Sequence, residues 1–287
     1  MSVGLMGAGL MGSAMVERLL DRQIPVMAYN RTPTRLAALE TQGARIASSP
    51  AEVLQQTEVI LLMLTDADAI RTVLLTGSTQ ALLADHTVIQ MGTISPQDSQ
   101  TIGAEITAAG GDYLEAPVLG SIGEARSGQL QIMVGASPAQ FEQWIGLLQH
   151  LSPAPRLIGP IGTAAALKLA LNQLIGSLTT AFAASLGLVL RQGIEVEVFM
   201  EILRQSALYA PTFDKKLQRM VDQNFAQPNF PTKHLLKDIQ LFIKTAEAAG
   251  LNVANVVGVE EILEQAIALN LANEDYSALF AAMNPTL

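Results

Sequence analysis

The chain has 287 residues, of which 49% are hydrophobic, with a formal net charge of −9, three histidines and no cysteine. This length and hydrophobic content allow two globular domains, since a single core usually stops growing at about 250–300 residues, and the acidic charge would repel nucleic acid and anionic membranes. The lack of cysteine excludes disulfides, thiolate metal ligands and a cysteine nucleophile, and three scattered histidines argue against any other metal site.

The first half of the chain alternates short apolar runs with helix-like stretches. Strands alternating with helices are typical of a mostly parallel, helix-covered sheet, so residues 1–161 are predicted to form a doubly wound Rossmann-type α/β domain. We expect a cytoplasmic protein, because no basic leader or cleavable apolar segment precedes the first predicted strand. The predicted strands are residues 3–6, 25–29, 44–47, 59–64, 87–91, 113–116 and 131–134.

After the loop at residues 159–162 the pattern changes to long helical periods, which predicts an all-helical C-terminal domain over residues 162–287. This domain begins with a long apolar stretch, residues 163–190, in which Lys168 and Asn172 are embedded. A membrane span would need basic flanks and interfacial aromatics, and an unpaired lysine inside a membrane is costly. We therefore interpret the stretch as a helix buried in a core or a subunit interface, and expect a homodimer or homotetramer.

A glycine-rich turn follows the first predicted strand and precedes a helix-like stretch. Gly7 permits the sharp turn, Gly9 lets a pyrophosphate approach the backbone, and Gly12 lets the helix pack closely on the strand. A lone glycine triplet also occurs in ordinary tight turns, but the order of strand, turn and helix favours a dinucleotide. The whole loop, with Leu10 and Met11 between its last two glycines, is therefore assigned to the cofactor.

The residues after the second predicted strand decide which dinucleotide is expected. An enzyme selective for NAD places an acidic residue there on the ribose hydroxyls, whereas this chain has Asn30, Arg31 and Thr32. A guanidinium and a hydroxyl can bind the 2′-phosphate of NADP through charge-assisted hydrogen bonds. The alternative is a solvated arginine in a turn. The pattern predicts NADP, with NADPH preferred over NADH.

Ligands of an open parallel sheet bind beyond the carboxyl ends of its strands. Leu64 ends the fourth predicted strand and Thr65 follows it; both are assigned to the cofactor, and Thr93 follows the fifth strand. Farther on, Gly120 and Ser121 offer backbone amides and a hydroxyl suited to a substrate carboxylate. The same segment could equally be a strand exit broken by proline and glycine.

Lys168 and Asn172 are four residues apart and therefore share one face of an otherwise apolar helix. The lysine could snorkel to solvent. A desolvated lysine, however, has a lowered pKa and can exchange a proton near neutral pH, which suits carbonyl reduction. A second polar segment, residues 230–238 (FPTKHLLKD), gathers one aromatic, three basic and one acidic side chain, although it could simply be a charged helix start.

Five signatures appear in order along the chain: GLMGAGLMG, NRT, EAPVLGSIGEARSGQL, KLALN and KHLLKD. With them the chain resembles the β-hydroxyacid dehydrogenase family, which includes 3-hydroxyisobutyrate dehydrogenase, and within it the glyoxylate/succinic semialdehyde reductases most closely. The resemblance covers essentially the whole chain. It implies a Rossmann domain joined by a long helix to an all-helical domain that closes the cleft and forms subunit contacts.

The resemblance also implies roles for individual residues. One departure concerns the substrate loop, in which Leu119 and Ser121 stand where the family usually has serine and then glycine or serine. The implied roles are a catalytic lysine at Lys168, a substrate-orienting asparagine at Asn172, a substrate or nicotinamide contact at Thr93, a cleft wall at Phe230, a cofactor contact at Lys237, and a residue at Asp238 that positions the lysines.

The predicted function is the NADPH-dependent reduction of a small carboxylate-bearing aldehyde or keto acid, such as glyoxylate or succinic semialdehyde, to the hydroxy acid. Lys168 is the expected proton donor, and the substrate carboxylate is expected on Gly120 and Ser121. Oxidation of 3-hydroxyisobutyrate or another β-hydroxyacid is the close alternative. An imine reductase and a non-catalytic NADP-binding module are the remote ones. Lys168 argues against the first, and the presence of both Lys168 and Asn172 argues against the second.

Overall fold

The computed structural model describes residues 2–285, and the chain divides into two compact units, Met1–Lys168 and Leu169–Leu287. The division lies inside the long helix α9 (Thr163–Arg191), so the first residues of this helix belong to the first unit. The boundary predicted from the sequence lies in the loop just before the helix, after residue 161.

A nine-stranded, mostly parallel sheet forms the first unit, as the alternating pattern predicts. Its strand order is β3-β2-β1-β4-β5-β6-β8-β7, with β9 paired to β8. Strand β8 runs antiparallel to β6 and β7, and the other pairings are parallel. The strands are β1 (Val3–Met6), β2 (Val26–Tyr29), β3 (Arg45–Ile46), β4 (Val59–Leu62), β5 (Thr87–Gln90), β6 (Asp112–Glu115), β7 (Val118–Leu119), β8 (Gln131–Gly135) and β9 (Arg156–Gly159).

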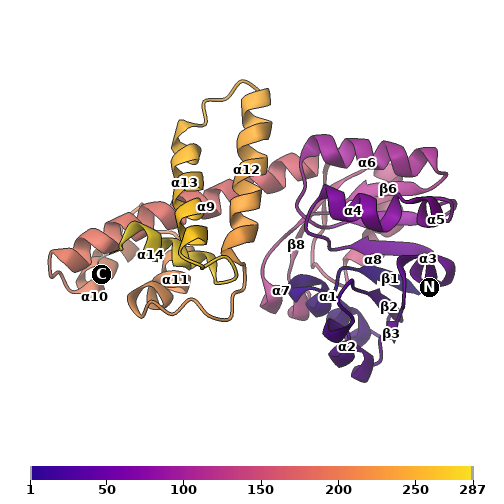
Figure 1. Cartoon of the computed structure of the whole chain (residues 1–287), viewed down its shortest axis with the longest axis horizontal. Helices are drawn as coiled ribbons and strands as arrows, with labels where there is room; N and C mark the ends of the chain where they lie inside the picture. Colours follow the sequence, from indigo (N-terminus) through magenta and orange to yellow (C-terminus); the bar gives the residue numbers. More distant parts are fainter. Residues whose placement is uncertain (1, 286–287) are drawn as a thin grey trace. The chain divides into compact units, whose positions relative to one another are not determined.

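Helices cover both faces of this sheet, because strand side chains alternate between two apolar cores. Leu5 and Leu61 belong to the core beneath α1, α7 and α8, whereas Met6 and Leu62 belong to the core beneath α3, α4 and α6. Figure 1 shows α4 and α6 on one side of the sheet and α1 and α7 on the other. The helices are α1 (Leu10–Asp21), α2 (Ala37–Thr41), α3 (Pro50–Gln56), α4 (Ala67–Leu74), α5 (Gly77–Gln80), α6 (Pro96–Ala108), α7 (Ile122–Ser127) and α8 (Pro138–Leu148), with a 3₁₀ turn η1 (Pro33–Arg35).

Three of these helices begin with the same local signal, a serine followed by proline. Ser49, Ser95 and Ser137 each accept a hydrogen bond from the backbone three residues on, and the following proline occupies the first helical position. Proline suits that position because its missing N–H would be unsatisfied there in any case. Local sequence therefore fixes where α3, α6 and α8 begin.

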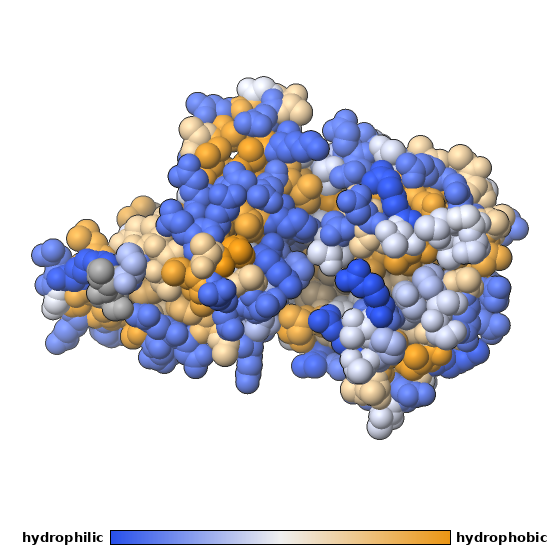
Figure 2. All heavy atoms as spheres, in the orientation of Figure 1, coloured by the Kyte–Doolittle hydropathy of each residue, from blue (hydrophilic) through white to orange (hydrophobic). Residues whose placement is uncertain are grey.

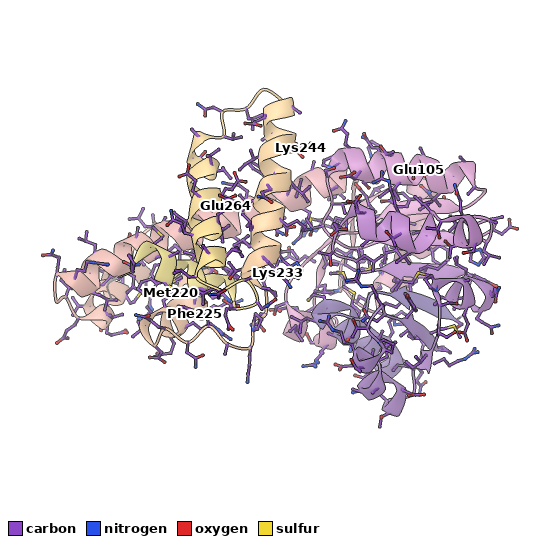
Figure 3. All side chains as sticks on the ribbon, viewed as in Figure 1. Glu105, Met220, Phe225, Lys233, Lys244 and Glu264 are labelled. Carbon is purple, nitrogen blue, oxygen red and sulfur yellow. The ribbon has the colours of Figure 1, made fainter. Side chains whose placement is uncertain are left out.

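The second unit is helical, and its described residues contain one isolated bridge, Pro231 to Asp275, outside the helices. Met220 and Phe225, labelled in Figure 3, are buried in this unit, and Phe225 accepts a backbone hydrogen bond of 2.9 Å from Asp275. Besides the rest of α9, the helices are α10 (Val196–Arg204), α11 (Pro211–Val221), α12 (Thr232–Ala248), α13 (Ala254–Ala268) and α14 (Leu279–Met283), with a 3₁₀ turn η2 (Tyr276–Ala278).

A buried ion pair ties α11 to η2. Lys216 Nζ lies 2.8 and 2.9 Å from the two carboxylate oxygens of Asp275 and 4.2 Å from the ring centroid of Tyr276. Asp275 also accepts bonds from the backbone and the hydroxyl of Ser277. Burial alone would raise the pKa of Asp275, but the Lys216 ammonium and Ser277 hold it below its usual value. Every polar atom of this carboxylate is thereby satisfied.

Helix α9 is long and apolar enough to cross a membrane by length and composition alone, with a mean hydropathy of 1.6 over its most apolar window. Only 39% of that window is buried, and Leu174, Leu178 and Leu188 remain exposed along it. Figure 2 shows hydrophobic residues interspersed with hydrophilic ones on the visible surface of the helical unit. The chain by itself therefore leaves apolar surface on α9 uncovered.

Candidate active site

The glycine loop forms the turn between β1 and α1. Gly7 has a φ of +106°, which favours glycine, and a Cβ there would overlap the carbonyl of Met63. A Cβ at Gly12 would overlap the carbonyl of Gly7, so the helix could not pack so closely on the turn. At Gly9 the nearest neighbour of a Cβ would be Arg35, at 3.9 Å. The backbone at Gly9 is therefore open to a ligand, and the cradle fits a dinucleotide pyrophosphate at the start of α1.

Beyond β2, the predicted ribose-phosphate segment forms an exposed turn. Asn30 Nδ2 donates a 3.0 Å hydrogen bond to the carbonyl of Thr32, which shapes the turn. Within the described part of the chain, Arg31 is exposed and has no ion-pair partner. A second arginine, Arg35, was not among the predicted site residues, and η1 places it beside Gly9. Its signal was the second arginine in NRTPTR, four residues after Arg31.

The loops at the carboxyl ends of β1, β4 and β5 lie against one another. The loops after β4 and β5 are so close that a Cβ at Gly92 would overlap the carbonyl of Leu64. Strand β1 lies between β2 and β4 in the sheet, so the chain reverses its direction of strand addition here. This is the topological switch point at which open α/β sheets bind ligands. The predicted cofactor residues Leu64 and Thr65 and the predicted contact Thr93 are all in these loops.

The predicted carboxylate site on the loop after β7 already engages a carboxylate of the chain. The backbone N–H of Ser121 donates to Glu124 Oε2 at 2.9 Å, and the Ser121 hydroxyl donates to the same oxygen. Gly120 has a φ of +134°, and a Cβ there would lie 3.1 Å from the Cβ of Glu124. A substrate carboxylate would therefore have to displace Glu124. Glu124 was not among the predicted site residues, although the spacing Ser-x-x-Glu is typical of a capping box.

Lys168 and Asn172 lie one turn apart on α9 and are only 8% and 1% exposed. Asn172 Nδ2 donates a 2.6 Å hydrogen bond to Asp238 on α12, and the other carboxylate oxygen of Asp238 lies 2.9 Å from Lys237 Nζ. A short chain of polar groups thus runs from Lys237 through a buried carboxylate to Asn172. Phe230, just before α12, is partly buried and packs edge-on against Tyr276, with the two ring centroids 5.9 Å apart.

The structure therefore groups the predicted site residues into two sets. The first unit contains the glycine loop, the turn after β2, Thr93 and the substrate loop, and the second contains Asn172, Phe230, Lys237 and Asp238. Lys168 is the last residue of the first unit and is joined to Asn172 by continuous helix. Among the described residues, no group of three or more histidine, aspartate and glutamate side chains could hold a metal ion.

Known proteins share both halves of this arrangement. Residues 2–159 match the family model for the NAD-binding domain of 6-phosphogluconate dehydrogenase, and residues 162–283 match that for NADP-dependent 3-hydroxyisobutyrate dehydrogenase. Glyoxylate/succinic semialdehyde reductase 1 of Arabidopsis thaliana is 31% identical over 99% of this chain and 98% of its own length. The chain belongs to the β-hydroxyacid dehydrogenase family. Like its family, it is an NAD(P)-dependent oxidoreductase that acts on CH–OH groups of small molecules.

Solved structures agree with this family assignment. The 3-hydroxyisobutyrate dehydrogenase of Salmonella typhimurium superposes with a TM-score of 0.88 at 26% identity, covering 97% of this chain and 98% of that one. An imine reductase of Myxococcus stipitatus in complex with NADP+ has a TM-score of 0.68 at 21% identity, covering 97% and 98%. The imine reductase shares the fold alone, whereas the 3-hydroxyisobutyrate dehydrogenase covers the same share of the chain with a higher TM-score.

Proposed function

We propose that this β-hydroxyacid dehydrogenase uses NADPH to reduce a small carboxylate-bearing aldehyde or keto acid, such as glyoxylate or succinic semialdehyde, to the hydroxy acid. The observation that carries the proposal is the buried pair Lys168 and Asn172 on one face of α9, with Asn172 fixed by Asp238. When bound, the reduced nicotinamide supplies the hydride that the carbonyl carbon accepts. The substrate class follows the Arabidopsis relative, whose name refers to glyoxylate and succinic semialdehyde.

The side chains of this protein supply the proton and the electrostatic stabilisation. The ammonium of Lys168 stabilises the negative charge that develops on the carbonyl oxygen and donates a proton to that oxygen. Asn172 orients the same oxygen through its amide, which is held by the carboxylate of Asp238. Thr93 and the amide at Gly120 contact the substrate, with Phe230 as an apolar wall, and the substrate carboxylate takes the place of Glu124 on the Ser121 amide.

An NADPH oxidation screen tests this function directly. Glyoxylate, succinic semialdehyde, tartronate semialdehyde and methylmalonate semialdehyde are offered in turn, and the matching hydroxy acids are offered with NADP+. Turnover of glyoxylate or succinic semialdehyde supports the proposal. If no carbonyl is reduced and no alcohol oxidised, a non-catalytic NADP-binding module replaces it.

The second candidate is oxidation of 3-hydroxyisobutyrate or a similar β-hydroxyacid. It is favoured by the match of residues 162–283 to a family model named for the NADP-dependent 3-hydroxyisobutyrate enzyme. The reverse arm of the same screen separates the two. A larger kcat/KM for 3-hydroxyisobutyrate with NADP+ than for any aldehyde with NADPH would favour the dehydrogenase. The remote imine reductase alternative is argued against by Lys168, since such enzymes usually lack a lysine there.

Replacing Arg31 with glutamate is expected to lower the preference for NADPH over NADH at least tenfold. Arg31 is exposed in the turn where the 2′-phosphate is expected, and each lost charge-assisted hydrogen bond is worth about 1.5–3 kcal/mol. The value of kcat/KM with NADH should change little, because NADH lacks that phosphate. Arg22→Glu, an equal charge change at the exposed end of α1, is the control. Equal losses with both cofactors would mean that Arg31 only supports the turn.

The protein is expected to sediment as a homodimer or a larger homo-oligomer. Leu174 and Leu188 on α9 are 50% and 62% exposed, and exposed apolar surface of this kind usually marks an interface. Leu188→Glu should shift the sedimentation coefficient toward that of a monomer. Leu251→Glu changes a similarly exposed leucine in the loop between α12 and α13 and should have no such effect. A parent chain that is monomeric at micromolar concentration would contradict the prediction.

A further inference from the structure

The last residue of β6, Glu115, is a carboxylate that is only 1% exposed. Its Oε1 accepts three backbone N–H bonds, from Gly162 at 2.8 Å, Ala164 at 2.9 Å and Ala165 at 3.2 Å. Its other oxygen accepts a hydrogen bond from the hydroxyl of Ser99 on α6. Both oxygens of a buried carboxylate are thereby satisfied by four donors from two elements.

The three amides belong to the start of α9, where a helix leaves its first N–H groups without intrahelical partners. A serine, threonine or aspartate just before the helix commonly satisfies them, but this chain has Gly162 there, with a φ of +100°. Glu115 therefore caps α9 from the sheet, 47 residues away from Gly162 in the sequence. The carboxylate also carries the charge that favours a helix N-terminus.

The surroundings of Glu115 hold it in a single position. Ser99, itself fully buried, lies 2.9 Å from the hydroxyl of Tyr113, so its hydroxyl is held between two partners. On the other side, a Cβ at Gly135 would lie 2.6 Å from Glu115 Cγ, which means that the strand β8 closes directly over the side chain. Burial raises the pKa of Glu115, although Ser99 and the three amides oppose this.

Lys168 is the sixth residue of α9, about 8 Å along the helix axis from its start at a rise of about 1.5 Å per residue. A rigid helix transmits a displacement of its first turn to the residues that follow. We propose that Glu115 is a positioning residue for the reaction: by fixing the first turn of α9 to the carboxyl end of the sheet, it sets where Lys168 presents its ammonium. This inference rests on the proposed role of Lys168.

A double-mutant cycle tests this role. Glu115→Gln keeps the size of the side chain and removes its charge and one acceptor, and it is expected to lower kcat about tenfold to a hundredfold with little change in KM for NADPH, because small misplacements of a catalytic group are costly. In a Lys168→Met background the same change should alter the single-turnover rate by less than about threefold. Equal factors in the two backgrounds would overturn the proposal.

A matched control is Glu52→Gln. Glu52 likewise accepts a backbone and a hydroxyl bond, both from Ser48, at the start of a different helix, and it is only partly buried. This control should leave kcat unchanged. If Glu115→Gln does not fold, as judged by thermal unfolding, Ser99→Ala takes its place in the cycle with the same expected coupling, because it removes one of the four donors and leaves the carboxylate.

Chemical labelling of Lys168 tests its position without requiring any enzyme turnover. It therefore tests this inference separately from the proposed function. Acetylation of Lys168 by acetic anhydride, measured by peptide mass spectrometry relative to the exposed Lys244, is expected to speed up in Glu115→Gln and to stay constant in Glu52→Gln. An unchanged relative rate at Lys168 would overturn the positioning role even if the parent enzyme reduces glyoxylate. Failure of the parent to reduce any carbonyl would overturn the proposed function instead.

Discussion

Replacing Lys168 with methionine is expected to lower kcat by about two to four orders of magnitude, the usual range for loss of a positioned proton donor. The affinity for NADPH should survive, because the glycine loop and the turn after β2 that are proposed to hold the cofactor are left unchanged. Single-turnover rates of carbonyl reduction measure the first effect, and NADPH fluorescence titration measures the second. Methionine preserves the length of the side chain, so the packing of α9 should be retained.

The control for Lys168→Met is the same change at Lys244 (labelled in Figure 3), which removes an exposed ammonium from α12. Its kcat should match that of the parent. Turnover close to that of the parent in the Lys168 variant would remove this residue from the proposed mechanism, and loss of NADPH binding together with kcat would indicate a structural role.

Asp275→Asn is expected to reduce the free energy of unfolding by about 3–5 kcal/mol, since removing one partner of a buried ion pair leaves the other charge uncompensated. Lys216 would lose its only carboxylate within 4 Å among the described residues and remain buried beside Tyr276. Urea unfolding followed by circular dichroism measures the change. Asp222→Asn, at an exposed position after α11, should stay within about 0.5 kcal/mol of the parent.

The pH dependence of that difference follows from the lowered pKa of Asp275. A carboxylate whose pKa is lower in the folded state stabilises the fold above its unfolded value of 3.8 and loses this contribution as the pH falls through the folded value. The difference in the free energy of unfolding between the parent and Asp275→Asn should therefore be largest at neutral pH and decrease below about pH 4. In addition, a Lys216→Met/Asp275→Leu double variant should cost less than the two single changes together. Additive losses would show that the two side chains do not act as a pair.

Long apolar runs made most of the fold predictable. Every predicted strand in the first half has a counterpart in the sheet, and β1, β4 and β5 are buried over their whole length. Strands β7 and β9 were missed for a physical reason. Strand β7 has only two residues and exists through pairing with β8, and β9 alternates exposed and half-buried side chains at the edge of the sheet. Partners that lie far away in the sequence define both strands.

The candidate site also combines features that are set by local sequence with features that depend on partners far away in the sequence. The glycine loop was predictable because its constraints are local, as the overlap between Gly12 and the carbonyl of Gly7 shows. The partnership of Asn172 with Asp238 joins residues 66 positions apart, and only the resemblance to a family suggested that both belong to the site. Glu124 did carry a local signal, but only the hydrogen bonds of Ser121 show that this carboxylate occupies both donors of the predicted substrate site.

The closure of β8 over Glu115 links two positions that no sequence pattern connects. Any side chain at Gly135 would overlap the Glu115 carboxylate, so alanine at 135 and glutamate at 115 exclude each other in this backbone. A lineage could change residue 135 only after shortening residue 115, and shortening residue 115 first would leave a void under β8 and loosen the cap of α9. The order of mutational steps is therefore constrained, and the two positions form an epistatic pair that is expected to covary among relatives.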